Sequence, residues 1–159
     1  MKVYKFGGAS VKDANSIKNI VNVLKINGYE DVFMVISAMG KTTNALEEVV
    51  KAYFEKSDFN QKIKRIEETH LNIIKELFPN PNVLNQEIHL IFEELNEFLG
   101  RNKSPNYNFV YDQVVSYGEL ISTKIISFYL NSVGISTTWL DVRDYIKTDD
   151  TYREGKVNW

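Results

Sequence analysis

Cysteine is absent from the 159 residues, and histidine occurs only twice. Without cysteine the chain can form no disulfide framework, no thiolate nucleophile and no Cys-based zinc site. Proline occurs three times, so it marks few boundaries between elements. No apolar run approaches the length of a membrane span, and the N-terminus enters a strand directly, which leaves no room for a signal peptide. We therefore expect a cytoplasmic protein with no membrane partner.

An excess of positive charge is also missing. The 19 Lys and Arg residues face 21 Asp and Glu residues, and the formal net charge is -2. Nucleic-acid binding normally requires a basic face, so we expect no nucleic-acid partner. The hydrophobic content of 43% and the charged content of 25% are ordinary for a globular protein. The length fits one domain with a real core, and an enzyme or a binding domain is the expected class.

The first 37 residues have the pattern of a βαβ unit. Residues 1–6 alternate as a strand does, and residues 13–26 repeat their apolar positions at helical spacing. Asp13 and Gly28 are the expected N-cap and C-cap of that helix. Residues 31–37 form a nearly continuous apolar run, which predicts a strand buried on both faces of a parallel sheet. The crossover between the two strands is expected to be right-handed.

A glycine loop joins the first strand to the first helix, with the sequence Lys5-Phe6-Gly7-Gly8-Ala9-Ser10. Paired glycines let the backbone approach a ligand closely, and successive N–H groups in such a turn can form an anion nest. The helix N-terminus that follows adds partial positive charge, and Lys5 adds a full charge. These features suit a phosphoryl group. The alternative is a tight turn for packing, with Lys5 solvated.

A second loop follows the second strand, at residues 37–44, and leads into a helix predicted at 45–54. Open α/β sheets bind ligands at the carboxyl ends of their strands, so the two loops can face one pocket. The hydroxyl groups of Ser37, Thr42 and Thr43 could donate to a carboxylate or a phosphate. They could equally cap the helix.

Residues 58–104 are predicted to form a helical hairpin inserted into the α/β unit. Two apolar stripes at helical spacing are separated by a turn that contains Pro79 and Pro81. His70 and His89 both lie in this hairpin, away from the glycine loop. We expect both to be partly exposed helix residues without a catalytic role.

A long helical pattern then covers residues 110–130 and contains Gly118 beside Glu119. Glycine costs about 1 kcal/mol relative to alanine inside a helix, so the pair predicts a break between two helices, with Glu119 opening the second. Glu119 could be a functional carboxylate or simply a helix-start glutamate favoured by the helix dipole. Residues 135–140 are predicted to form a third strand.

Four segments, in this order along the chain, resemble the aspartate kinases of the amino acid kinase family. They are Lys5 to Ser10, Val35 to Leu46 (with Ser-Ala-Met-Gly-Lys-Thr-Thr-Asn inside it), Ser116 to Ser122 (Ser-Tyr-Gly-Glu-Leu-Ile-Ser), and Asp141 to Glu154. The resemblance covers nearly the whole chain. It implies an α/β fold, a three-layer αβα sandwich with a mostly parallel sheet, of which residues 1–159 would be the N-terminal, amino-acid-binding lobe. The family's ATP-base lobe and ACT regulatory domains have no counterpart here, so we expect weak or no turnover from this chain alone.

The resemblance also implies roles for individual residues. Lys5 would be the catalytic residue that bridges the phosphates of ATP. The cofactor-binding residues would be Lys5, Phe6, Gly7, Gly8 and Ser10, and the residues that bind L-aspartate would be Ser37, Thr43 and Glu119. Glu119 would pair with the substrate ammonium. Mg²⁺ would accompany ATP, with no metal ligand in this chain.

The implied reaction is the ATP-dependent phosphorylation of L-aspartate to 4-phospho-L-aspartate, the first step of lysine, threonine and methionine synthesis. The full-length enzyme would be a homo-oligomer. Such chemistry needs positioning and charge stabilisation rather than a nucleophilic side chain, which agrees with the absence of cysteine. The alternatives are a non-catalytic module that binds an anion or an amino acid, and another amino acid kinase with a different acceptor.

Overall fold

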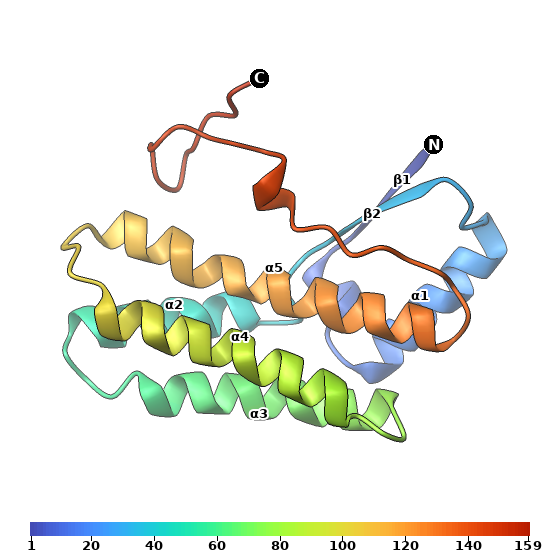
Figure 1. Ribbon diagram of the computed structural model, residues 1–159, viewed down its shortest axis with the longest axis horizontal. Coiled ribbons are helices and arrows are strands. Elements are labelled where there is room, and N and C mark those ends of the chain that lie inside the picture. Colours follow the sequence, from blue (N-terminus) through green and yellow to red (C-terminus); the bar gives the residue numbers. More distant parts are fainter.

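The computed structural model describes residues 1–159, and Figure 1 shows its elements. In chain order they are β1 (Lys2–Phe6), the short 3-10 helix η1 (Gly8–Val11), α1 (Ala14–Asn27), β2 (Val32–Ile36), α2 (Thr42–Phe54), α3 (Asn60–Leu77), α4 (Asn82–Arg101), α5 (Tyr107–Ser132) and η2 (Val142–Asp144). The predicted α/β class is confirmed. No helix combines the length and the apolar character that a membrane crossing would require.

β1, α1 and β2 form the predicted βαβ unit. The two strands pair in parallel, from Lys2 opposite Val32 to Phe6 opposite Ile36. Asp13 caps α1 as predicted, because its Oδ1 accepts a hydrogen bond of 2.7 Å from the Ser16 N–H. That bond stabilises the carboxylate and holds the pKa of Asp13 below its usual value.

The sheet has two strands and is covered by helices on one side only. Tyr4, Phe6 and Met34 point inward and pack against the core. Phe33 and Val35 point the other way and are 44% exposed. The expectation that the second strand is buried on both faces was therefore wrong for this chain. An apolar run shows that both faces can be buried, but it does not show whether a covering layer is present.

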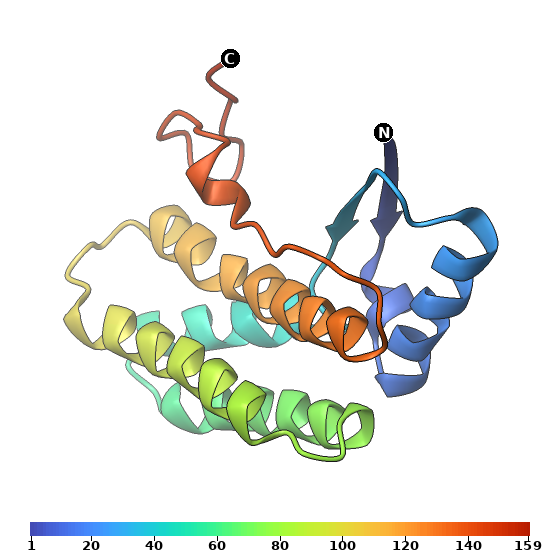
Figure 2. The ribbon, with the colours of Figure 1, turned by 45° about the vertical axis from the view of Figure 1, so that its right-hand side comes forward.

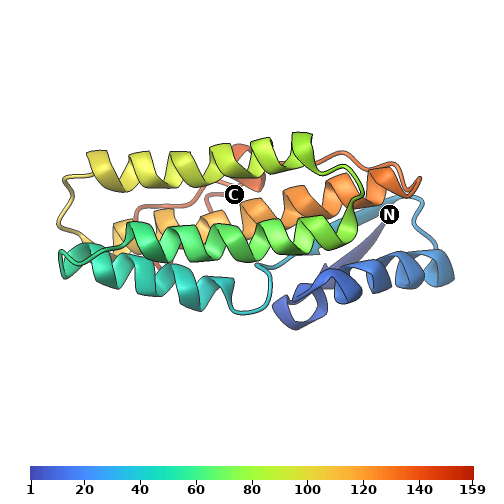
Figure 3. The same cartoon turned by 90° about the horizontal axis from the view of Figure 1, so that it is seen from below.

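Helices α2 to α5 form a bundle beside the βαβ unit (Figures 1 and 3). Each contacts two others, because α2 packs against α3 and α5, and α4 packs against the same two helices. The predicted hairpin is present as α3 and α4. The last turn of α2 is bonded to the end of α4, where the Tyr53 hydroxyl donates to the Asn102 carbonyl over 2.8 Å. The core of the bundle is apolar and includes Leu46, Val49, Ile63, Ile74, Ile88, Phe92, Leu95, Leu99, Val114 and Ile121.

α5 is one continuous helix of 26 residues, so the predicted break at Gly118 was wrong. A Cβ added at Gly118 would lie 2.9 Å from the Cβ of Ala38 and 3.4 Å from the Leu46 side chain. The glycine is therefore required by the close approach of the 37–40 loop and α2. The sequence pattern alone cannot distinguish a glycine that ends a helix from one that admits a neighbour.

Residues 135–140 form no strand, which corrects the prediction of a third one. Side chains of α5 bind this segment instead: Asn131 Nδ2 donates to the Thr137 carbonyl over 3.1 Å, and Trp139 Nε1 donates to Thr123 Oγ1 over 2.9 Å. Figure 2 shows the segment leaving the end of α5 and running past the strand pair. A cavity of about 300 Å³ separates it from β2, so no ladder forms between them.

The end of the chain returns to the start of α5. The Tyr152 ring meets the Phe109 ring edge to face at 5.3 Å. Arg153 lies over the Tyr111 ring at 4.3 Å, and its N–H donates to Asp112 Oδ2 over 2.6 Å. These contacts fix the tail on the bundle without adding an element to the sheet.

Candidate functional site

The two loops at the carboxyl ends of β1 and β2 touch each other. The Ser37 N–H donates to the Phe6 carbonyl over 3.0 Å, and the Gly40 N–H donates to the Gly8 carbonyl over 3.1 Å. A Cβ at Gly8 would lie 2.9 Å from the Ala38 carbonyl oxygen, inside van der Waals contact. Gly8 is therefore needed for this approach. The two loops therefore meet at one edge of the sheet, and that they face one pocket stays a prediction.

The glycine loop presents free donors. The N–H groups of Gly7, Gly8 and Ala9 make no hydrogen bond to the rest of the chain. Lys5 Nζ lies 3.4 Å from the position that a Cβ of Gly7 would occupy, so its ammonium lies close to the loop. Lys5 makes no ion pair. Successive free amides beside an uncompensated ammonium are the features of an anion site.

Two more predicted residues of this loop take different positions. Phe6 is partly buried and its ring packs against the core, so only its backbone can face a ligand. Ser10 lies in η1 and is exposed, with its N–H bound to the Gly7 carbonyl over 2.8 Å. Its hydroxyl makes no bond within the chain and remains free for a ligand.

The start of α2 presents a second set of free donors. The helix begins at Thr42, three residues before the predicted start, and no side chain caps it. The N–H groups of Thr43 and Asn44 find no acceptor in the preceding loop. Orphan amides at a helix N-terminus, together with the helix dipole, favour an anion such as a carboxylate. Thr43, which is half-buried, lies in this first turn.

Glu119 lies in the middle of α5 and faces the second loop. Its Oε1 accepts a hydrogen bond of 3.2 Å from the Ala38 N–H, and its other carboxylate oxygen makes no bond within the chain. Ser122, one turn further along α5, donates from Oγ to the Ser37 carbonyl over 2.9 Å. The helix therefore holds Ser37 and Ala38 from one face. Sequence reasoning gave Ser122 no role, although its spacing of three residues from Glu119 placed both on one helix face.

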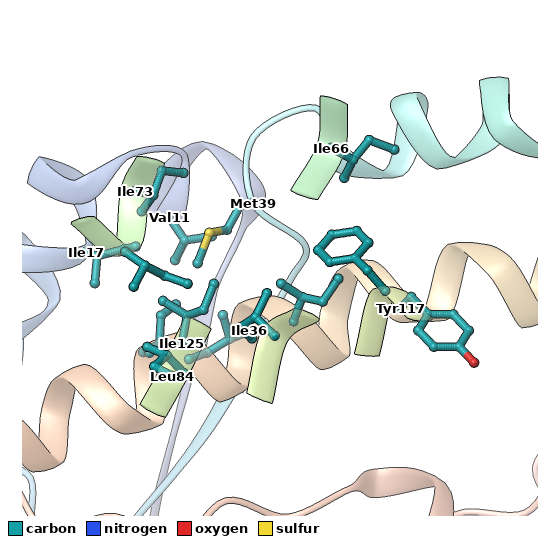
Figure 4. Packing of buried hydrophobic residues seen from close by; sticks show 14 of the residues in the cluster. Val11, Ile17, Ile36, Met39, Ile66, Ile73, Leu84, Tyr117 and Ile125 are labelled. Atoms are coloured by element: carbon teal, nitrogen blue, oxygen red, sulfur yellow. The ribbon is translucent and has the colours of Figure 1, made fainter. Parts of the chain in front are cut away.

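Tyr117 precedes this pair and is buried at the edge of the core. Figure 4 shows its hydroxyl pointing away from the apolar cluster that contains Val11, Met39 and Ile73. Burial and, to a smaller extent, the charge of Glu94 raise the pKa of Tyr117 to about 12. Tyr117 is therefore neutral at physiological pH, and we assign it a packing role.

His70 is the prediction that failed most clearly, because it is 1% exposed. Its Nδ1 lies 2.7 Å from the Ile66 carbonyl, and its Nε2 lies 3.4 Å from Thr42 Oγ1. Burial lowers the pKa of His70. The sequence did indicate that His70 is buried, since His70 falls on the apolar stripe of its own helix. His89 is exposed, as expected, and lies 2.7 Å from Glu67.

The structure thus brings the glycine loop, the 37–40 loop, the start of α2 and Glu119 together. Thr42 does not take part as a ligand group, because its hydroxyl donates to the Met39 carbonyl over 2.7 Å. No three His, Cys, Asp or Glu side chains gather in the way a metal centre requires. What the arrangement offers is two sets of amide donors, a lysine and one free carboxylate oxygen.

The chain resembles several proteins of known activity. "Aspartokinase 1, chloroplastic" of Arabidopsis thaliana is 32% identical over 154 residues, which cover 93% of this chain and 27% of that protein. "Lysine-sensitive aspartokinase 3" of Escherichia coli is 27% identical over 150 residues, which cover 94% of this chain and 33% of that protein. The crystal structure of E. coli aspartokinase III with aspartate and ADP superposes with a TM-score of 0.83 at 25% identity, over 99% of this chain and 35% of that one.

These matches extend along almost all of the chain but not of the relatives, of whose length it spans about a third or less. The model of the amino acid kinase family matches residues 1–158. The fold, the two touching loops and this match agree, and the chain belongs to the amino acid kinase family.

Proposed function

We propose that this chain is the amino-acid-binding part of an aspartate kinase, which transfers a phosphoryl group from ATP to the side-chain carboxylate of L-aspartate. One observation carries the proposal: Glu119 Oε1 binds the Ala38 N–H in the loop that also touches Gly8. A carboxylate with a free oxygen therefore lies beside two sets of amide donors. L-aspartate has the complementary charges, one ammonium and two carboxylates.

The glycine loop suits the phosphates. Lys5 and the free amides of Gly7 and Gly8 would hold the phosphoryl oxygens, and the Ser10 hydroxyl would add a donor. ATP supplies the phosphoryl group, and Mg²⁺ would accompany it without a ligand from this chain. The role of Lys5 is to neutralise the charge that the transferring group carries, as phosphoryl transfer requires. Removing one such group typically costs about 2.7–4 kcal/mol at the transition state.

The second loop and α5 suit the acceptor. The Thr43 hydroxyl, the amides at the start of α2 and the Ser37 side chain would bind the substrate carboxylates. The free oxygen of Glu119 would accept a hydrogen bond from the ammonium. E. coli aspartokinase III, whose structure was solved with aspartate and ADP, supports this choice of acceptor by its likeness to the chain. An acetylated acceptor would have no ammonium for Glu119 to bind.

The remaining features are expectations for the whole enzyme. We propose 4-phospho-L-aspartate as the product, a homo-oligomeric assembly and a cytoplasmic location. The expectation that this chain alone turns over weakly stays a prediction.

Calorimetric titration of the purified chain with L-aspartate, N-acetyl-L-aspartate and Mg-ATP tests the proposal. We expect binding of L-aspartate but not of its acetylated form. Glu119→Gln should weaken aspartate binding by about tenfold or more, because a charge-assisted hydrogen bond is lost. Lys5→Met should weaken Mg-ATP binding and leave aspartate binding nearly unchanged.

Glu76→Gln and Lys64→Met are the matched controls, because both residues are exposed on α3 and make no hydrogen bond or ion pair through their side chains. They should bind both ligands as the original chain does. Equal binding of L-aspartate and N-acetyl-L-aspartate, or unchanged L-aspartate binding by Glu119→Gln, would show that Glu119 does not bind the substrate ammonium. Failure of the original chain to bind either ligand would contradict a preformed site in this chain.

A further inference from the structure

The hairpin meets the second loop at a cavity of about 230 Å³. The cavity is lined by Lys12, which directly follows η1, and by residues of the loop before α2, of α2 itself and of α3. The polar and charged residues in it are Lys12, Lys41, Thr42, Thr69 and His70. His70 is the one that is almost fully buried, and neither the glycine loop nor Glu119 accounts for it.

The contacts of His70 fix its tautomer. A carbonyl can only accept, so Nδ1, at 2.7 Å from the Ile66 oxygen, must carry the proton. A neutral imidazole then has an unprotonated Nε2, which is an acceptor. Burial, to which the Phe92 ring at 5.9 Å contributes, lowers the pKa of His70 and favours the neutral form, against the smaller effect of the bond to the Ile66 carbonyl.

Thr42 is the group that this acceptor faces. Its hydroxyl oxygen lies 3.4 Å from His70 Nε2 and 2.7 Å from the Met39 carbonyl, so its one proton has two buried acceptors. Both contacts are buried, so the Thr42 hydroxyl faces the interior. The Thr42 methyl group also lies 3.5 Å from the position of a Cβ at Gly118. Thr42 thus joins α3, α5 and the loop.

We propose that His70 is a positioning residue, which holds Thr42 inward and so keeps residues 37–43 in the conformation that binds the amino acid. That the loop binds an amino acid rests on the proposed function. That His70 keeps the loop in its conformation does not. The hairpin then supports the substrate site indirectly, because His70 contacts the loop and not the ligand.

Amide hydrogen exchange of this chain, followed by NMR without ligand, tests the hold on the loop. The reporters are the N–H groups of Gly40 and Thr42, which are bonded to Gly8 and Met39. His70→Phe should speed their exchange by about fivefold, the effect of one neutral hydrogen bond. Thr42→Val removes the contact with His70 and also the bond to the Met39 carbonyl, so it should speed exchange by at least as much. The double variant should exchange no faster than Thr42→Val alone, because Thr42→Val already removes the contact with His70.

Two rescues and one control separate positioning from general damage. His70→Gln, with an amide oxygen near the position of Nε2, and Thr42→Ser, which keeps the hydroxyl, should both exchange nearly as the original chain does. His89→Gln changes the exposed histidine of the same hairpin and should leave Gly40 and Thr42 unchanged. If His70→Phe fails to fold, His70→Asn replaces it, because the shorter amide can still donate to the Ile66 carbonyl but does not extend to Thr42. Unchanged exchange in His70→Phe, or a further increase when His70→Phe is added to Thr42→Val, would overturn the proposal.

Ligand affinity provides a second, separate result. His70→Phe should weaken L-aspartate binding by about fivefold and leave Mg-ATP binding unchanged, whereas a general loss of stability would not select one ligand. If the original chain binds no aspartate, the proposed function fails and the exchange experiment still tests His70. If aspartate binds equally to both chains while exchange differs, His70 holds the loop without serving the substrate, and the positioning role is wrong.

Discussion

Gly118→Ala offers the sharpest test of how the site is assembled. In an exposed helix the change from glycine to alanine stabilises by about 1 kcal/mol. At position 118 the new Cβ would lie 2.9 Å from the Ala38 Cβ, a separation that real Cβ atoms do not show. Ala38 has little freedom to move, because its N–H is bound to Glu119 and its carbonyl lies against Gly8.

Gly100→Ala is the matched control. Gly100 also lies in a helix, near the end of α4, and a Cβ there would meet nothing within 4 Å. Overpacking in a core costs about 1–3 kcal/mol. Since the helix propensity gained is similar in the two variants, the free energies of unfolding should differ by about 1–3 kcal/mol, with Gly118→Ala the less stable. Gly100→Ala should be as stable as the original chain or more so.

Urea unfolding followed by far-ultraviolet circular dichroism measures both variants, and equal slopes against urea concentration would show that the unfolded states are comparable. The midpoint of thermal unfolding should differ in the same direction, by about 2–4 °C for each kcal/mol. Equal stabilisation of both variants would refute the close approach of α5 to the loop, and with it the position assigned to Glu119.

Two further predictions concern single interactions. Asp13→Ala should lower the free energy of unfolding by about 1 kcal/mol in urea titrations, because α1 loses its cap on the Ser16 N–H, and Asp13→Ser should recover most of the loss. The hydrogen bond that His89 donates to Glu67 raises the pKa of His89 above 6.5, so the stabilisation from this pair is complete below pH 6.5 and is lost as the pH rises through the folded-state pKa. The stability of His89→Gln should therefore fall less than that of the original chain between pH 6 and 8, and an unchanged pH dependence would contradict the pair.

The sequence pattern correctly predicted those parts of the fold that depend on residue spacing and on turn residues. The cap at Asp13, the hairpin turn at Pro79 and Pro81 and the parallel pairing of the first two strands follow from spacing and turn chemistry. The touching of the two loops followed from a general rule on the carboxyl ends of strands. These features all lie within the βαβ unit and the loop after it, or within the hairpin.

The errors share a different cause, which is packing between segments far apart in the sequence. Gly118 faces Ala38, 80 residues away, and a single sequence gives no sign of that neighbour. Residues 135–140 have the composition of a strand, but a hydrogen bond from Asn131 to Thr137 and one from Trp139 to Thr123 decide their position. His70 could have been predicted as buried from its stripe, although its contact with Thr42 could not.

The open face of the sheet has a consequence for how the protein behaves at high concentration. β2 is a five-residue stretch without charge, Val-Phe-Met-Val-Ile, and one of its edges has no ladder partner. Such a stretch is a template for strand addition and aggregation. Lys5, opposite Val35 in the register, is the charged residue among the apolar side chains of that face. Lys5 therefore opposes strand addition, in addition to the phosphate-binding role proposed for it, so a Lys5→Met chain should be compared with the original at matched monomer concentration.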